Sequence, residues 1–293
     1  MAPVIIGEDP TNLEYLCNKI KRALPHHYAT QAGVEFAIWD LNGKALGVPV
    51  YQLIGGKVRD GVDLMGFVAQ DHPEKMAVEA DAILRESTFP VLKMKIGKCP
   101  DLDLKRYSAV AEAIGDRAVI QVDGNIGYTM AQAVPTLMGM EKIGRLGCVE
   151  QAVKRLDDMA ELARLIPVPM MADEGVYVPD DAIELVCSGA ASLALIKITK
   201  GGGILNTKKI ASIFESAGLI LSIAIYYDLI GVAAAHIAAS TPCVKWPSPF
   251  TYTLDTILTE PFEPHGLILR VPEKPGFGVA FDPDKIARYA LPL

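Results

Sequence analysis

The chain has 293 residues, of which 51% are hydrophobic and 22% are charged, and its formal net charge is −7. This size and composition allow one large α/β barrel or two smaller domains, while the acidic balance argues against a nucleic-acid or anionic-membrane binder. No stretch reaches the ~18 consecutive apolar residues of a membrane span, the N-terminus lacks a signal-peptide pattern, and the five cysteines are scattered, as in reduced proteins. We therefore expect a globular, cytoplasmic protein.

The first 60 residues are predicted to form helices. Apolar residues at helical spacing predict one helix in residues 9–24, which Pro25 ends. A second helix is predicted in residues 29–47, and a turn-rich passage follows it. The tail, residues 251–293, is rich in proline and glycine and is expected to be extended chain that folds back over another part of the molecule.

Between these two parts, short apolar segments alternate with longer amphipathic ones. This alternation predicts repeated βα units and a parallel sheet, which this many units would close into a barrel. An open doubly wound sheet is the alternative, but the first strand is not followed by the glycine-rich loop typical of that fold. The predicted strands are residues 62–69, 91–97, 118–125, 147–151, 168–175, 193–199 and 219–225.

Several of these strands end in polar side chains, namely Asp123, Glu150, Asp173 and Lys197. The C-terminal strand ends of a barrel meet on one rim, which holds the active site. Three carboxylates gathered there would repel one another unless a cation lies among them. Oxygen ligands favour Mg²⁺ over zinc, which prefers histidine or cysteine.

Lys93 and Lys95 lie two residues apart in one strand, so both ammonium groups leave it on the same face. An edge strand with one wet face would also explain them. Beside the predicted carboxylates, they instead flank a metal from one side while Lys197 flanks it from the other. A lysine near a cation has a lowered pKa, which suits a general base. Lys200 lies past its strand and is expected to be solvated, and His236 is expected to be a core or helix-surface histidine.

Five motifs in this order resemble the enolase superfamily, in its mandelate racemase/muconate lactonizing enzyme family and the muconate-lactonizing-enzyme-like subgroup. They are KMK (93–95), VDGN (122–125), VEQ (149–151), ADE (172–174) and IKITKGGG (196–203). Residues 33–56 resemble the stretch that precedes the barrel in that family, and residues 271–289 resemble its closing segment.

The resemblance implies a (β/α)7β barrel of the TIM type with a partial α+β cap. Residues 1–60 would be the helical remnant of an N-terminal cap domain, residues 61–250 the barrel, and residues 251–293 a segment that returns to the cap. The family's cap opens with antiparallel strands, and we expect these to be absent here because the sequence starts at the cap helices. Many relatives also carry a glutamate at the end of the seventh strand, where this chain has Tyr227 or Asp228.

The resemblance also implies site roles. Asp123, Glu150 and Asp173 would bind Mg²⁺, or Mn²⁺ in its place, with Asn125 and Glu174 as supporting residues. Lys95 and Lys197 would be acid/base groups on opposite faces of a small carboxylate substrate, and Lys93 would assist Lys95. The common step is removal of the proton α to the carboxylate, which gives a metal-stabilised enediolate.

An isomerase is therefore expected, either a racemase/epimerase or a cycloisomerase, acting as a homo-oligomer. The alternatives are an acid-sugar or hydroxy-acid dehydratase on the same scaffold, a catalytically impaired metal-binding barrel, and a Schiff-base lyase that uses Lys197 as its nucleophile. The sequence does not identify the substrate.

Overall fold

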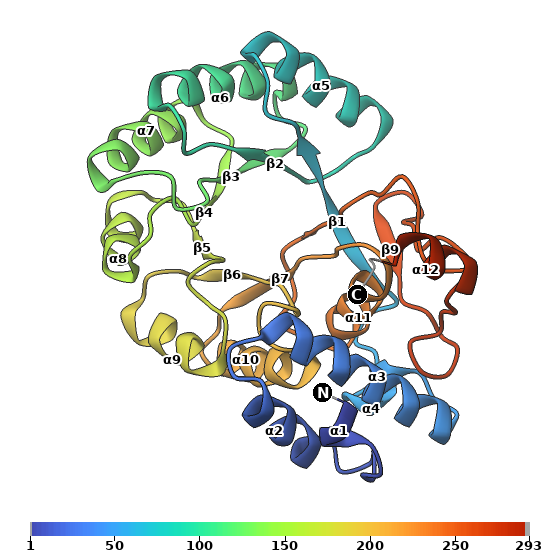
Figure 1. Ribbon diagram of the computed structural model, residues 1–293. Helices are drawn as coiled ribbons and strands as arrows, with labels where there is room; N and C mark the ends of the chain where they lie inside the picture. The colour runs from blue at the N-terminus through green and yellow to red at the C-terminus, as the bar shows by residue number, and fades with distance from the viewer. Residues whose placement is uncertain (1, 291–293) are drawn as a thin grey trace.

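A computed structural model describes residues 2–290, and its centre is a near-closed barrel of eight parallel strands (Figure 1). The strands occupy β1 (Gly61–Val68), β2 (Val91–Lys95), β3 (Val119–Asp123), β4 (Leu146–Glu150), β5 (Met170–Ala172), β6 (Leu193–Ile196), β7 (Ile220–Ile223) and β8 (Ser248–Pro249). Each of the seven predicted strands is present, so the predicted α/β barrel is confirmed and an open sheet is not formed.

The strands follow one another around the barrel in the order β7-β6-β5-β4-β3-β2-β1-β8. The ring is completed between β7 and the segment around β8, where the Ile225 N–H donates to the Pro249 carbonyl at 2.9 Å. The sequence did not predict β8, because this strand has only two residues in a proline-rich passage.

Helices follow the strands and lie on the outside of the ring (Figure 1). They are α5 (Pro73–Glu86), α6 (Pro100–Ile114), α7 (Met130–Ile143), α8 (Leu156–Leu165), α9 (Pro179–Ser188), α10 (Ile204–Ser216) and α11 (Asp228–Ala239). Prolines at the starts of α5, α6 and α9 favour these helix boundaries, because a helix needs no N–H donor there. Across residues 2–290, no helix is both long and apolar enough to cross a membrane.

The N-terminal helices are α1 (Ala2–Ile5), α2 (Leu13–Ala23), α3 (Tyr28–Leu46) and α4 (Val50–Leu53). Helix α3 is joined to the barrel by Glu35, whose buried carboxylate accepts the Leu205 N–H at the start of α10 at 2.8 Å. A carboxylate is favoured at this helix end because it satisfies an otherwise unpaired donor.

The tail lies in part against these helices. It contains β9 (Ile268–Arg270), which pairs antiparallel with β1, and α12 (Pro283–Tyr289). The Val50 N–H donates to the Gly276 carbonyl at 2.8 Å, and the Phe277 N–H donates to Asp40 at 2.9 Å. The tail segment around Gly276 therefore packs against helices α3 and α4.

His236 on α11 is a fully buried histidine that connects three parts of the chain. Its Nδ1 accepts the Tyr51 N–H at 3.1 Å, and its Nε2 lies 3.1 Å from the Phe277 carbonyl and donates to it. Burial lowers its pKa from 6.5 to about 4, although the Phe277 carbonyl opposes this shift. His236 is thus a structural core histidine, one of the two positions expected for it.

At a pH between about 4 and 6.5, His236 is mostly neutral in the folded protein and mostly protonated in the unfolded chain. Lowering the pH therefore favours the unfolded chain and reduces folding stability. Between about pH 7 and about pH 5 this histidine should reduce the free energy of unfolding by about 2 kcal/mol. Urea denaturation at both pH values measures the loss. In His236→Gln this component should vanish, while the four other histidines contribute equally to both proteins. An identical pH dependence in the two proteins would contradict the assignment.

Candidate active site

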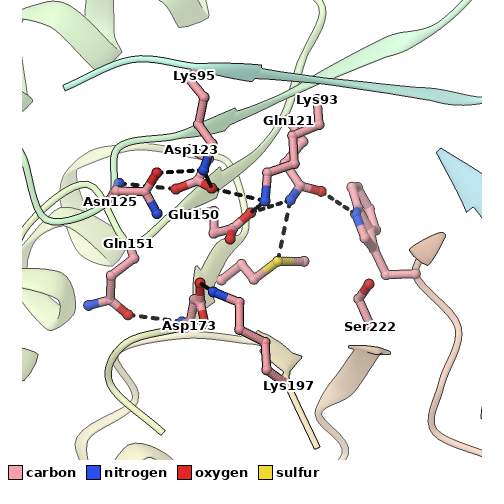
Figure 2. A network of polar contacts seen from close by, with 12 residues as sticks. Lys93, Lys95, Gln121, Asp123, Asn125, Glu150, Gln151, Asp173, Lys197 and Ser222 are labelled. Carbon is pink, nitrogen blue, oxygen red and sulfur yellow. Dashed lines mark hydrogen bonds and ion pairs between the residues drawn. The ribbon is translucent and has the colours of Figure 1, made fainter. Parts of the chain in front are cut away.

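Adjacent barrel strands deliver a row of charged side chains to the C-terminal rim. Lys95 on β2 is the register partner of Asp123 on β3, and Asp123 is the partner of Glu150 on β4. Register partners in parallel strands point to the same face, so the three side chains meet inside the barrel mouth (Figure 2). Asp173 and Lys197 directly follow β5 and β6 and complete the row.

The lysines of β2 are held by two carboxylates. The Lys93 ammonium lies 2.6 Å from Glu150 Oε2 and 2.9 Å from Asp123 Oδ2, and the Lys95 ammonium lies 2.5 Å from the same Asp123 oxygen. Strand β2 lies between β1 and β3, and Lys93 is only 5% exposed. The wet edge strand, which was the alternative explanation for these lysines, is therefore wrong.

The opposite side of the mouth is built around Asp173. Its carboxylate is paired with the ammonium groups of Lys197 and Lys200, and the Lys200 ammonium lies 2.9 Å from Asp173 Oδ1. The Gln151 side chain accepts the Asp173 N–H at 2.9 Å and so fixes the turn after β5. The prediction of a solvated Lys200 is wrong, because the turn at residues 198–202 folds this side chain back onto Asp173 and leaves it 10% exposed.

The two supporting residues are also in contact with this site. The Asn125 side-chain carbonyl accepts from the Lys95 ammonium, and the Asn125 amide donates to Glu174 Oε1 at 3.0 Å. Glu174 follows β5 in an irregular turn, so its side chain does not simply alternate away from that of Asp173 as it would in a strand. Asn125 thus connects the β3 and β5 loops.

The electrostatic environment of each group is set by burial and by these ion pairs. Burial opposes ionisation of Asp123, but the ammonium groups of Lys93 and Lys95 outweigh it and hold the Asp123 pKa below its usual value. Burial dominates at Glu150 and raises its pKa to about 7.

The pKa shifts of the site lysines differ from those that the sequence predicts. Burial disfavours the charged forms of Lys93 and Lys197, but neighbouring carboxylates outweigh it and raise the pKa of both ammonium groups. The predicted lowering of the lysine pKa assumed that a metal cation lies next to each ammonium group. In this structure carboxylates lie next to Lys93 and Lys197 instead. Among the lysines paired here, the pKa of Lys200 is lowered, because its burial outweighs its pairing with Asp173.

The donor chemistry of this site fits a hard divalent cation. Asp123, Glu150 and Asp173 are each at most 1% exposed, and Glu150 Oε1 has no hydrogen-bond partner in the described part of the chain. In the arrangement of residues 2–290, however, no three acidic, histidine or cysteine side chains are grouped so that they could hold a metal. Lysine ammonium groups lie against the carboxylate oxygens, so binding a cation requires some of these ion pairs to open.

A cavity of about 630 Å³ lies above this row of charges. Lys93, Lys95, Asp123 and Lys197 line its polar part, and its remaining lining is largely apolar, with Phe67, Tyr226 and Phe250 among the residues. Tyr227 is exposed, whereas the Asp228 carboxylate accepts the Ile257 N–H at 3.2 Å. After the seventh strand, Ala224 and Tyr226 line the cavity, and Tyr226 is the one of the two with a polar group.

Two polar residues beneath the row were missed from the sequence. Gln121 donates to Glu150 Oε2 at 2.5 Å, and its carbonyl accepts the Trp246 indole N–H at 2.6 Å. The signal for Gln121 was available, because it lies two residues before Asp123 and must share its face of β3. Trp246 had no such signal, because it comes from an irregular segment before β8.

Comparison with known proteins identifies the family. Residues 75–285 match the family model of the enolase C-terminal domain-like proteins. Residues 1–55 match that of the mandelate racemase/muconate lactonizing enzyme N-terminal domain.

Individual relatives agree with this match. Muconate cycloisomerase 1-1 of Acinetobacter lwoffii is 30% identical over 98% of this chain and 77% of its own length. The L-Ala-D/L-Glu epimerase of Bacillus subtilis (strain 168) is 30% identical over 95% of this chain and 78% of its own. The solved structure of muconate lactonizing enzyme from Pseudomonas putida superposes with a TM-score of 0.93 and 29% identity, covering 99% of this chain and 83% of that one.

The named relatives are isomerases, which confirms the predicted enzyme class. Both the N-terminal helices and the barrel thus match models and structures of one family. The chain therefore belongs to the mandelate racemase/muconate lactonizing enzyme family of the enolase superfamily.

Proposed function

We propose that this protein is a Mg²⁺-dependent isomerase that removes a proton α to the carboxylate of a small substrate. The proton would then return to the same carbon, as in a racemase or epimerase, or the anion would rearrange, as in a cycloisomerase. The relatives support both outcomes, because they include a muconate cycloisomerase and an L-Ala-D/L-Glu epimerase.

The observation that carries the proposal is the placement of two lysines on opposite sides of the buried carboxylates. Lys95 and Lys197 line the same cavity and lie on either side of Asp123, Glu150 and Asp173 (Figure 2). Their side chains are 34% and 24% exposed, whereas the carboxylates are at most 1% exposed. A planar substrate between the two ammonium groups would meet one acid/base group on each face.

Each lysine acts through its protonation state. A paired, protonated lysine donates a proton, and it accepts one only after the pairing that favours its charged form has weakened. Lys95 and Lys197 each have one carboxylate partner, Asp123 and Asp173 respectively. Lys93 is shared by two buried carboxylates, so its charge is fixed, and it would assist Lys95 by keeping a positive charge beside the substrate carboxylate.

Asp123, Glu150 and Asp173 would hold the divalent cation, with Asn125 and Glu174 keeping the surrounding loops in place. When bound, a divalent cation supplies positive charge that lowers the free energy of the anion formed on deprotonation. Without it, Lys93, Lys95, Lys197 and Lys200 neutralise the same carboxylates.

The two-lysine assignment predicts that Lys95→Ala and Lys197→Ala each lower the isomerisation rate by roughly 10²- to 10⁴-fold, because each variant lacks one proton-transfer group. A panel of muconates, dipeptides and N-acyl amino acids in D₂O, followed by NMR, first identifies a substrate through α-deuterium incorporation. The same assay then compares the variants. Lys98→Ala is the matched control, because Lys98 is exposed and lies three residues beyond Lys95. Full isomerisation by either site variant would show that the lysine pair is not the acid/base pair.

The cation assignment predicts stabilisation by Mg²⁺. At about 100 times its dissociation constant, Mg²⁺ should raise the free energy of unfolding by about 2.7 kcal/mol over that in EDTA, because it binds only the folded state. Urea denaturation with and without Mg²⁺ measures the difference. Asp173→Asn should abolish most of it, whereas Asp157→Asn, which changes an 84% exposed carboxylate on α8, should not. An equal Mg²⁺ effect in Asp173→Asn would place the ion elsewhere.

A further inference from the structure

A chain of three side chains crosses the interior of the barrel and ends at Glu150 in the row of charges. The Trp246 indole N–H donates to Gln121 Oε1 at 2.6 Å, and Gln121 Nε2 donates to Glu150 Oε2 at 2.5 Å. Gln121 and Glu150 stand on β3 and β4 (Figure 2). Trp246 belongs to the segment before β8. The chain therefore connects two separated parts of the barrel wall.

The tryptophan determines which way the Gln121 amide faces. An indole N–H can only donate, so it requires the carbonyl end of the amide, and the NH₂ end must then face Glu150. Rotating the amide by half a turn would place a carbonyl against the carboxylate and an NH₂ group against the indole, which loses both hydrogen bonds. Gln121 is fully buried, and unpaired buried polar groups are costly. The backbone N–H of Trp246 donates to the Leu221 carbonyl, so the backbone that carries the indole is also held in place.

The consequence is a defined orientation of the Glu150 carboxylate. Gln121 and Lys93 both donate to Oε2, and Oε1 is the buried oxygen without a hydrogen-bond partner among the described residues. Lys93 is less able to set this orientation alone, because it also contacts Asp123. The amide of Gln121 has no second carboxylate in contact among residues 2–290.

We infer that Gln121, oriented by Trp246, is a positioning residue that holds Glu150 with its Oε1 ready for the divalent cation. This inference rests on the proposed function, because it assumes that Glu150 binds the ion. Partners that orient a metal ligand commonly change metal affinity by 10- to 100-fold when they are lost. Gln121 would thus tune Mg²⁺ binding without touching the ion or the substrate.

Isothermal titration of the metal-free protein with Mg²⁺ tests this inference. Gln121→Met, which keeps the length of the side chain, should weaken Mg²⁺ binding about 10-fold or more. Trp246→Phe, which keeps an aromatic ring, should also weaken it. Because Trp246 acts through Gln121, the double variant should bind Mg²⁺ as Gln121→Met does, whereas independent structural effects would add. If Gln121→Met fails to fold, Trp246→Phe alone decides the question.

Ser222→Ala is the matched control. Ser222 is fully buried and donates to the Pro247 carbonyl beside Trp246, and no hydrogen bond joins it to Glu150 in the described structure. Its loss should therefore leave Mg²⁺ affinity within about 2-fold if the effect runs through Gln121. If the wild-type protein binds Mg²⁺ and Gln121→Met binds it with the same affinity, the inference is overturned but the proposed function is not. Additive losses of Mg²⁺ affinity in the double variant would have the same meaning. A wild-type protein that binds no Mg²⁺ would overturn the proposed function as well.

Discussion

Three buried carboxylates and four lysine ammonium groups share the mouth of the barrel, and every other feature of the site depends on their charge balance. Each carboxylate would be strongly destabilised without a positive partner, because burial opposes ionisation. The lysines supply that charge in the structure, and a divalent cation would supply it in the proposed enzyme. Opening an ion pair and binding a cation are therefore linked events. The carboxylates involved are Asp123, Glu150 and Asp173.

The barrel makes this balance possible because it fixes which side chains meet. The register of β2, β3 and β4 brings Lys95, Asp123 and Glu150 into one row. Below the row, Gln121 and a small apolar cluster that includes Cys148 and Met171 occupy the barrel interior. Ion pairs beside such a layer are screened less than pairs in water. Above the row, the cavity gives a small molecule access to the lysines. The site thus has a buried side toward the barrel interior and an accessible side toward the cavity.

Most of this architecture could be predicted from the sequence. The alternation of short apolar segments with helices gave the strands, and polar residues at strand ends gave a charged row that the structure does bring together, although their roles remain predictions. Features that depend on irregular backbone could not be predicted. Lys200 was expected in solvent because the turn that folds it onto Asp173 has no periodic pattern. Trp246 and β8 lie in a proline-rich passage without strand periodicity, and Gln121 acquires its meaning only once Trp246 is placed opposite it.

A bound cation would replace the Lys197 ammonium group as the partner of Asp173. The pKa of Lys197 reports this replacement most directly. In this structure its pairing with Asp173 raises that pKa. NMR titration of the side-chain amine, assigned by comparison with Lys197→Arg, would follow it in EDTA and in saturating Mg²⁺. A bound cation takes over Asp173 and adds a positive neighbour, so the pKa should fall in Mg²⁺. A Lys197 pKa that stays raised while Mg²⁺ is bound would contradict the claim that lysine and cation bind the same carboxylates. It would also contradict the role of Lys197 as a base.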